Sequence, residues 1–204
     1  MRRYKKLLAG AVIAMAGAAV LPVWTHAAMA QAQPAPAQDA VPAPAPAPPA
    51  AAAPTPVSYT SPEGDFSIVF PGPPMVDGRA PESDTAPGFW TYHAEDGHAV
   101  YQVRVDIYPK AIRVPAPNPR TYEFILRAYA TESSSQLTST APIQIGDHAG
   151  MEGIFTSASG ATETRRVVMA GHRVYQVAYT QTDAAAPAGQ GGSFLGSFVF
   201  VPRP

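Results

Sequence analysis

Apolar and polar residues alternate in several short segments of this chain, which is the pattern of strands with one face on a core. The clearest two cover residues 89–95 and 98–108. They are joined by Asp96-Gly97, a strong signal for a two-residue hairpin turn. The pattern therefore predicts an antiparallel hairpin at this place.

A turn at Asp96-Gly97 would pair Glu95 with His98 and Tyr92 with Tyr101. Side chains alternate across a strand, so this register also predicts the two faces of the hairpin. One face would carry Trp90, Tyr92, Tyr101, Val103, Val105 and Ile107, and the other would carry Thr91, His93, Glu95, His98, Gln102, Arg104 and Asp106.

A helix is predicted after the hairpin, with Asn118 as its cap and Pro119 in its first turn. Four residues then recur at helical spacing and form a stripe that would lie on a core: Tyr122, Ile125, Leu126 and Tyr129. The serines at 133–135 should end the helix.

Further strands are predicted on both sides of this unit. They cover residues 66–70, 143–145, 149–156, 163–169 and 173–180, with Tyr175, Val177 and Tyr179 on one face of the last. Pro71-Gly72-Pro73-Pro74 ends the strand at 66–70, and a polar loop follows up to Gly88. Turns at Ala170-Gly171 and at Gly171-His172 are both compatible with the sequence. A short helix at 193–198 and a final strand at 198–201 complete the chain. Strands in meanders with an interposed helix predict an α+β fold, a central antiparallel sheet covered by helix on at least one face.

The first thirty residues resemble a secretory signal peptide. Positive residues come first, residues 7–23 are almost entirely apolar, and Ala28-Met29-Ala30 gives the small-x-small pattern at which cleavage would follow Ala30. The apolar run is also long enough for an uncleaved membrane anchor, which is the alternative. The chain has no cysteine, which excludes a lipoprotein anchor and a disulfide framework. We expect a periplasmic or secreted protein.

Residues 31–56 consist almost entirely of alanine, proline and glutamine. Such a segment has too little large apolar surface to fold and favours extended polyproline II structure. We therefore expect a disordered linker here, either a plain solvated tail or a spacer from a membrane, followed by a single domain at 57–204.

Charge excludes some partners. The chain has 14 basic and 15 acidic residues. Loss of residues 1–30 would remove four basic residues and leave 10 against 15, a net charge of −5. Nucleic acids and anionic membranes are bound through clustered Lys and Arg. After loss of residues 1–30, Lys110 would be the only lysine left. We expect no nucleic-acid partner, and membrane contact only through an uncleaved N-terminal segment.

The outer face of the hairpin gathers His93, Glu95 and His98 as a candidate metal site. Imidazole and carboxylate groups are ligands of zinc and copper, and three ligands leave an open position. The alternative is a solvated hairpin tip. His148 and His172 have no such constellation around them and are expected in surface loops.

Catalytic motifs are not evident, and we expect no catalytic residue and no cofactor. Ser157 and Ser159 do not form a Gly-x-Ser-x-Gly elbow. The glycines at 189–192 lack the spacing of a dinucleotide fingerprint, and there is no P-loop.

The segment Ser61-Pro62-Glu63-Gly64-Asp65-Phe66-Ser67-Ile68-Val69-Phe70-Pro71-Gly72-Pro73-Pro74 resembles the opening of PsbP-like proteins. The strand at 171–177 and the segment Phe194-Leu195-Gly196-Ser197-Phe198 are also similar to that family. The resemblance implies a central antiparallel sheet sandwiched by helices and a binding role rather than catalysis, although fold does not fix function.

From these features we expect an exported, non-enzymatic binding or accessory domain of the cell envelope. Its partner would be an envelope protein or a small ligand. The alternative is a metal-binding or hydrolytic periplasmic protein that uses His93, Glu95 and His98.

Overall fold

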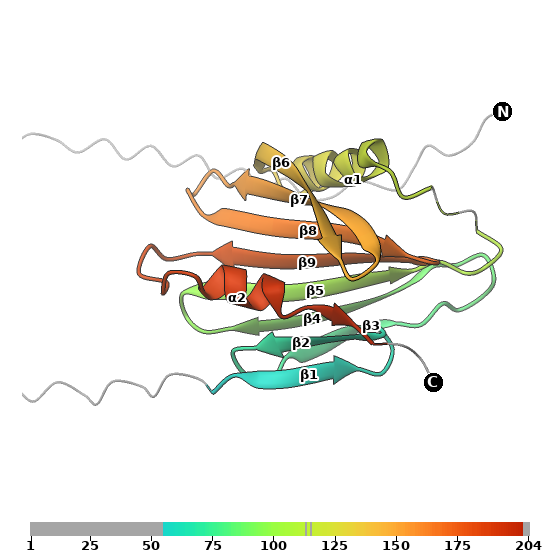
Figure 1. Ribbon diagram of the computed structural model, residues 1–204, viewed down its shortest axis with the longest axis horizontal. Coiled ribbons are helices and arrows are strands. Elements are labelled where there is room, and N and C mark those ends of the chain that lie inside the picture. The colour runs from blue at the N-terminus through green and yellow to red at the C-terminus, as the bar shows by residue number, and fades with distance from the viewer. Residues whose placement is uncertain (1–54, 113, 115, 202–204) are drawn as a thin grey trace, which may run out of the picture. The chain divides into compact units, whose positions relative to one another are not determined.

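The computed structural model describes residues 55–112, 114 and 116–201 (Figure 1). The predicted signal peptide at 1–30 and residues 31–54 of the predicted linker lie outside these described residues. Thr55 and Pro56 are exposed, and the first strand begins directly after them.

A seven-stranded antiparallel sheet forms the centre of the described domain (Figure 1). Its strand order is β3-β4-β5-β9-β8-β7-β6. The strands are β3 (Met75–Arg79), β4 (Gly88–Glu95), β5 (Ala99–Ile107), β6 (Gln136–Ile145), β7 (His148–Thr156), β8 (Thr162–Ala170) and β9 (Arg173–Gln181).

A second sheet has three antiparallel strands in the order β1-β2-β10. These are β1 (Val57–Ser61), β2 (Phe66–Phe70) and β10 (Val199–Phe200), so the two ends of the described chain meet in one small sheet. The two helices are α1 (Pro119–Glu132) and α2 (Gln190–Gly196).

One face of the large sheet packs against β2 and α2. Phe66 and Phe70 of β2 and Phe194 of α2 are buried there against Tyr101 and Val103. The aromatic rings meet mostly edge to face, as for Tyr101 and Phe194, whose centroids are 5.1 Å apart. This face contains the larger of the two apolar cores.

The opposite face packs against α1, which covers β6, β7 and β8. Tyr122 and Leu126 are its buried residues, and they join Met151, Phe155 and Val167 in a separate apolar cluster. The predicted cap is confirmed, because the Asn118 side chain accepts a 3.1 Å hydrogen bond from the main-chain N–H of Thr121. The helix ends at Glu132, as the serine run predicted.

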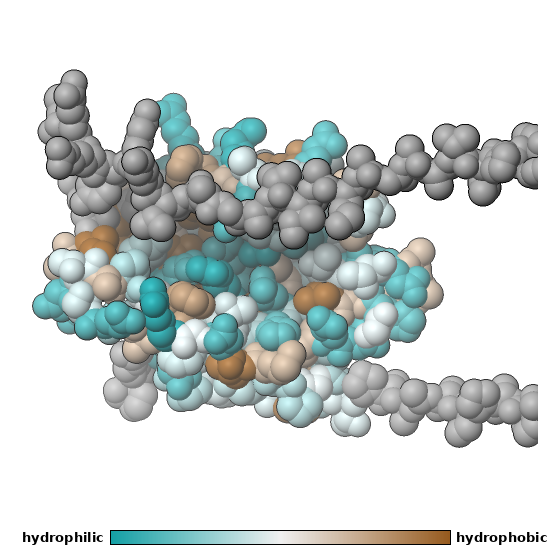
Figure 2. Space-filling view, turned by 180° about the vertical axis from the view of Figure 1, so that it is seen from behind, coloured by the Kyte–Doolittle hydropathy of each residue, from teal (hydrophilic) through white to brown (hydrophobic). Residues whose placement is uncertain are grey.

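The side opposite α2 is mainly hydrophilic along its middle (Figure 2). Polar residues of β5 and β9 that point away from the larger core, among them Gln102, Arg104 and Gln176, are half-buried. Alternation along β5 thus places its apolar residues in the larger core and its polar residues on the opposite face.

The hairpin β4–β5 has the predicted faces but not the predicted register. The apolar residues Tyr92, Tyr101, Val103 and Val105 are all buried in the larger core, as predicted. However, Tyr92 pairs with Val103 rather than with Tyr101. This is a shift of two residues, and it leaves every side chain on its predicted face because alternation has a period of two.

The shift has a local cause in the turn. The Asp96 carboxylate accepts hydrogen bonds of 2.9 Å from the main-chain N–H groups of both His98 and Ala99. Asp96 therefore faces Ala99, and Gly97, with φ +87°, becomes the first central residue of the turn. The turn lies one residue later than the sequence predicted.

Two edge strands correct the sequence prediction. Residues 75–79, expected within a polar loop, form β3, and β6 begins at Gln136 rather than at Ile143. Both strands lie at the edges of the large sheet. An edge strand has one unpaired side in water and accommodates polar residues and Pro142, so neither shows the alternation of a central strand.

The other sequence predictions agree with the structure apart from small differences at the ends. Ala170 pairs with Arg173, which settles the second hairpin turn at Gly171-His172. The predicted tail helix is α2, and the last strand begins at Val199, one residue later than expected. The domain is an α+β fold built mainly of antiparallel sheet.

Candidate functional site

The structure does not gather His93, Glu95 and His98 into a metal site. His93 pairs with Gln102 and Glu95 with Val100, while His98 lies in the turn. Within the described part of the chain, no group of three or more His, Asp or Glu residues is arranged to hold a metal ion.

His98 instead bonds to a different segment. Its Nδ1 lies 3.1 Å from the carboxylate of Asp183, in the loop after β9. The hydrogen bonds that Asp183 accepts from the main-chain N–H of Ala185 and from His98 lower the pKa of its carboxyl. This contact joins the hairpin tip to the loop after β9. It gives His98 a structural role that requires no metal.

The other motifs considered from sequence have local structural roles. The hydroxyls of Ser157 and Ser159 lie 2.8 Å apart in the β7–β8 turn, where Ser157 also accepts from the N–H of Ala161. Gly189 precedes α2 with φ +81°, a conformation that favours glycine. Gly191 lies against the ring of Tyr179, where a Cβ would approach within 2.5 Å.

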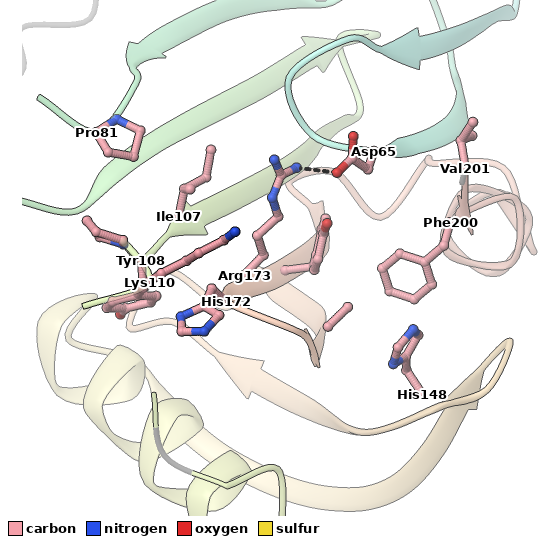
Figure 3. A pocket seen from close by; sticks show the side chains of 13 residues that line it. Asp65, Pro81, Ile107, Tyr108, Lys110, His148, His172, Arg173, Phe200 and Val201 are labelled. Atoms are coloured by element: carbon pink, nitrogen blue, oxygen red, sulfur yellow. Dashed lines mark ion pairs between the residues drawn. The ribbon is translucent and has the colours of Figure 1, made fainter. Parts of the chain in front are cut away.

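A pocket of about 620 Å³ lies at the end of the large sheet where β5 finishes and β9 begins (Figure 3). The turn between β8 and β9 forms one side of it, and the segment after β5 forms another. These two parts are joined, because the main-chain N–H of Tyr108 donates a 2.8 Å hydrogen bond to the carbonyl of His172. The size falls within the usual range for small-molecule sites.

The walls of the pocket are largely apolar and come from distant parts of the chain. They include Pro81, Ile107, Tyr108, Tyr175, Phe200 and Val201. The ring of Phe200 packs edge to face against Tyr175, with centroids 5.0 Å apart, and against His148 at 4.8 Å. Aromatic packing therefore fixes the wall at which β10 meets the sheet.

Ionisable side chains point into this apolar setting (Figure 3). Lys110, His148, His172 and Arg173 line the pocket together with one carboxylate, that of Asp65. Apolar walls with a few convergent polar groups are the usual composition of a ligand site.

Arg173 is already engaged. Its Nη1 lies 2.9 Å from the Asp65 carboxylate and donates a 2.7 Å hydrogen bond to the carbonyl of Glu63. The carbonyl of Asp65 in turn accepts from the N–H of Val201 at 2.9 Å. These contacts tie the start of β9 to the loop before β2 and to the end of β10.

Tyr108 lines the pocket with a neutral phenol. Burial and the nearby negative charge of Asp106 raise the pKa of Tyr108 above its ordinary value, and the opposing effect of Arg104 is smaller. The phenol of Tyr108 is therefore neutral throughout the physiological range.

No local signal in the sequence pointed to this pocket. Its ionisable residues lie in or directly beside three turns and in the loop after β5, separated by many residues along the chain. His148 and His172 were expected in surface loops; His172 is indeed exposed in a turn and His148 is half-buried at the start of β7, and both line the pocket. Only the antiparallel order of the strands brings these ends together.

No protein-family model matches this chain, and no curated protein sequence matches it significantly. Within residues 55–112, 114 and 116–201, no helix has the length and hydropathy that crossing a bilayer requires. The site itself therefore carries the functional argument.

Proposed function

We propose that this chain is an exported, non-enzymatic binding domain of the cell envelope, and that it takes a small ligand in the pocket at the end of the large sheet. The observation that carries the proposal is the composition of this pocket. Apolar walls built around Phe200 and Ile107 surround convergent polar groups from Lys110, His172 and Arg173. A binding site requires no further group, whereas catalysis requires a nucleophile or base in defined geometry.

Export is proposed from the N-terminal sequence. The positive residues, the apolar run at 7–23 and the Ala-Met-Ala at 28–30 together support cleavage near Ala30 and a periplasmic or secreted mature protein. Cell fractionation and the intact mass of protein from its native host test this. A mass that lacks residues 1–30 supports export with cleavage, and the full mass in the cytoplasm contradicts it.

A PsbP-like fold is part of the proposal. The segment at 61–74 resembles the opening of that family, and an antiparallel sheet with α1 on one face and α2 on the other is compatible with its sandwich. An experimental structure superposed on members of the family tests this assignment. A different strand order would contradict it.

The binding function is tested by filling the pocket. Ala170 lines it, so Ala170→Trp would occupy the space, whereas Ala184→Trp places the same ring at an exposed position and serves as the control. Protein recovered from the native envelope is analysed by native mass spectrometry. We expect a bound small molecule on the wild type and on the control, and its loss from Ala170→Trp. Retention by Ala170→Trp would contradict a ligand site in this pocket.

A further inference from the structure

We infer that the ligand of this pocket is an organic anion, a carboxylate or phosphate ester carried on an apolar, ring-containing body, with Lys110 as its charge partner. The inference rests on the proposed binding function and names the class of ligand.

The pocket has the opposite charge to the rest of the predicted mature protein. The charged side chains that line it are Lys110 and Arg173 against Asp65. The nearby carboxylate of Asp106 is paired with Arg104 at 2.8 Å. The mature chain as a whole would carry −5, from 10 basic and 15 acidic residues. A local positive field inside an acidic protein attracts anions to this place and repels them elsewhere.

The two cations are not equivalent. Arg173 is held by the Asp65 carboxylate and the Glu63 carbonyl, so much of its charge is compensated. No ion pair between described residues involves Lys110. Figure 3 shows the Lys110 side chain extending along the pocket with its ammonium directed toward its middle. Lys110 is therefore the cation with charge to offer a ligand.

The walls select the rest of the ligand. Ile107, Tyr175 and Phe200 present aliphatic and aromatic surface, which favours an apolar body and in particular a ring that can pack against Phe200. A bare inorganic anion would leave this surface in water. The combination of a single available ammonium with aromatic walls fits an amphipathic anion better than a fully polar one.

Three naphthalene compounds test the inference: naphthoate, naphthyl phosphate and the neutral naphthamide. Binding to the full-length protein is measured by isothermal titration calorimetry, with amide chemical shifts to locate the site. We expect both anions to bind in the pocket at least tenfold more tightly than the amide, because a charge-assisted contact contributes about tenfold or more. The tighter of the two anions distinguishes a carboxylate ligand from a phosphate ester.

Two substitutions separate the roles of the charges. Lys110→Gln should weaken binding of the anions about tenfold and leave naphthamide unchanged, while Lys110→Arg should retain the preference. Asp65→Asn should strengthen anion binding several-fold, because it removes the competing carboxylate from Arg173. Asparagine also tolerates the positive φ of 53° at this position, so the loop conformation should persist.

The outcomes that overturn the inference differ from those that overturn the proposed function. Equal binding of all three compounds in the pocket, or an anion preference that survives Lys110→Gln, would overturn the anion inference and leave the binding function intact. Chemical shifts confined to residues outside the pocket would overturn both. Unchanged or weaker anion binding in Asp65→Asn would contradict the assignment of Asp65 as the competitor for Arg173.

Discussion

The hydroxyl of Tyr101 donates a 2.6 Å hydrogen bond to the carboxylate of Asp96, five residues earlier in the same hairpin. The same carboxylate accepts from the main-chain N–H groups of the turn and, at 2.6 Å, from the side-chain amide of Gln190 at the start of α2. The Asp96 carboxylate thus sets the turn of the β4–β5 hairpin and attaches α2 to it. Burial raises the pKa of Asp96, but the hydrogen bonds outweigh it and the net pKa lies below its ordinary value.

We predict that Asp96→Asn destabilises the fold by about 1–3 kcal/mol at pH 7, because an amide cannot accept all of these hydrogen bonds. The folded-state pKa of Asp96 lies below the unfolded value of about 4. The stability from its ionised form is therefore present above pH 4 and is lost as pH falls through the folded pKa. Urea unfolding should show that the wild type and Asp96→Asn differ in free energy of unfolding at pH 7, and that this difference is smaller at pH 3. Asp84→Asn, at an exposed position, is the control and should leave the free energy of unfolding unchanged at both pH values.

We predict that ionisation of the Tyr92 hydroxyl lowers the free energy of unfolding in alkali. Burial is the largest cause that raises the pKa of Tyr92 to about 12, against the opposing hydrogen bond with Ser61. The folded value lies above the unfolded one of about 10, so this contribution is complete below pH 10 and is lost as pH rises toward 12.

Absorbance titration of tyrosinate measures this effect. Tyr92→Phe should remove one tyrosine equivalent from the phase near pH 12 and cost about 1 kcal/mol at neutral pH, because it breaks the 2.6 Å contact with Ser61. An unchanged titration in that range would contradict the raised pKa.

Two residues of α1 that lie two positions apart give a matched pair for testing how the helix packs. Leu126 is fully buried, whereas Phe124 is 71% exposed. We predict that Leu126→Ala lowers the free energy of unfolding by about 2–5 kcal/mol through a cavity beneath the helix. Phe124→Ala should change it by less than about 0.5 kcal/mol. Equal effects in thermal or urea unfolding would show that α1 lies on the sheet by another face.

A buried cation joins α1 to the large sheet. Arg165 is 3% exposed, its guanidinium lies 3.6 Å from the ring centroid of Tyr129, and its Nε donates a 2.7 Å hydrogen bond to Glu163. The hydroxyl of Tyr129 donates to the other oxygen of Glu163 at 2.7 Å. Removal of either charge would leave the other buried without its partner.

We predict that Arg165→Met destabilises the fold by about 3–5 kcal/mol, and that adding Glu163→Gln to it recovers part of this loss. The exposed ion pair of Arg79 and Glu82 is the control, and Arg79→Ala should cost less than about 1 kcal/mol. Urea unfolding of the wild type and of these three variants measures the differences in the free energy of unfolding. A small effect of Arg165→Met would mean that the buried pair contributes little net stability.

Local rules predicted the central hairpins and α1 well. The Asn118 cap, the stripe that contains Tyr122 and Leu126, and the faces of β4 and β5 depend on neighbours within one turn or one strand. The predicted register was wrong because the Asp96 side chain accepts hydrogen bonds from the main-chain N–H groups of the turn. The hydrophobic pattern does not show whether this interaction or a standard two-residue turn is more stable. The edge strand β3 was missed since it buries little and shows no alternation.

The sequence by itself determined the fold class, the buried faces and the proposed cellular location of the protein, because periodicity and composition act over short distances along the chain. Only the tertiary structure decided which ionisable groups meet. Among the described residues it does not arrange the candidate ligands His93, Glu95 and His98 as a metal site, and it places Lys110 in one pocket with His148 and Arg173. The physical reason is that antiparallel pairing of β5, β9, β8 and β7 brings remote turns to one end of the sheet, and no local pattern encodes that neighbourhood.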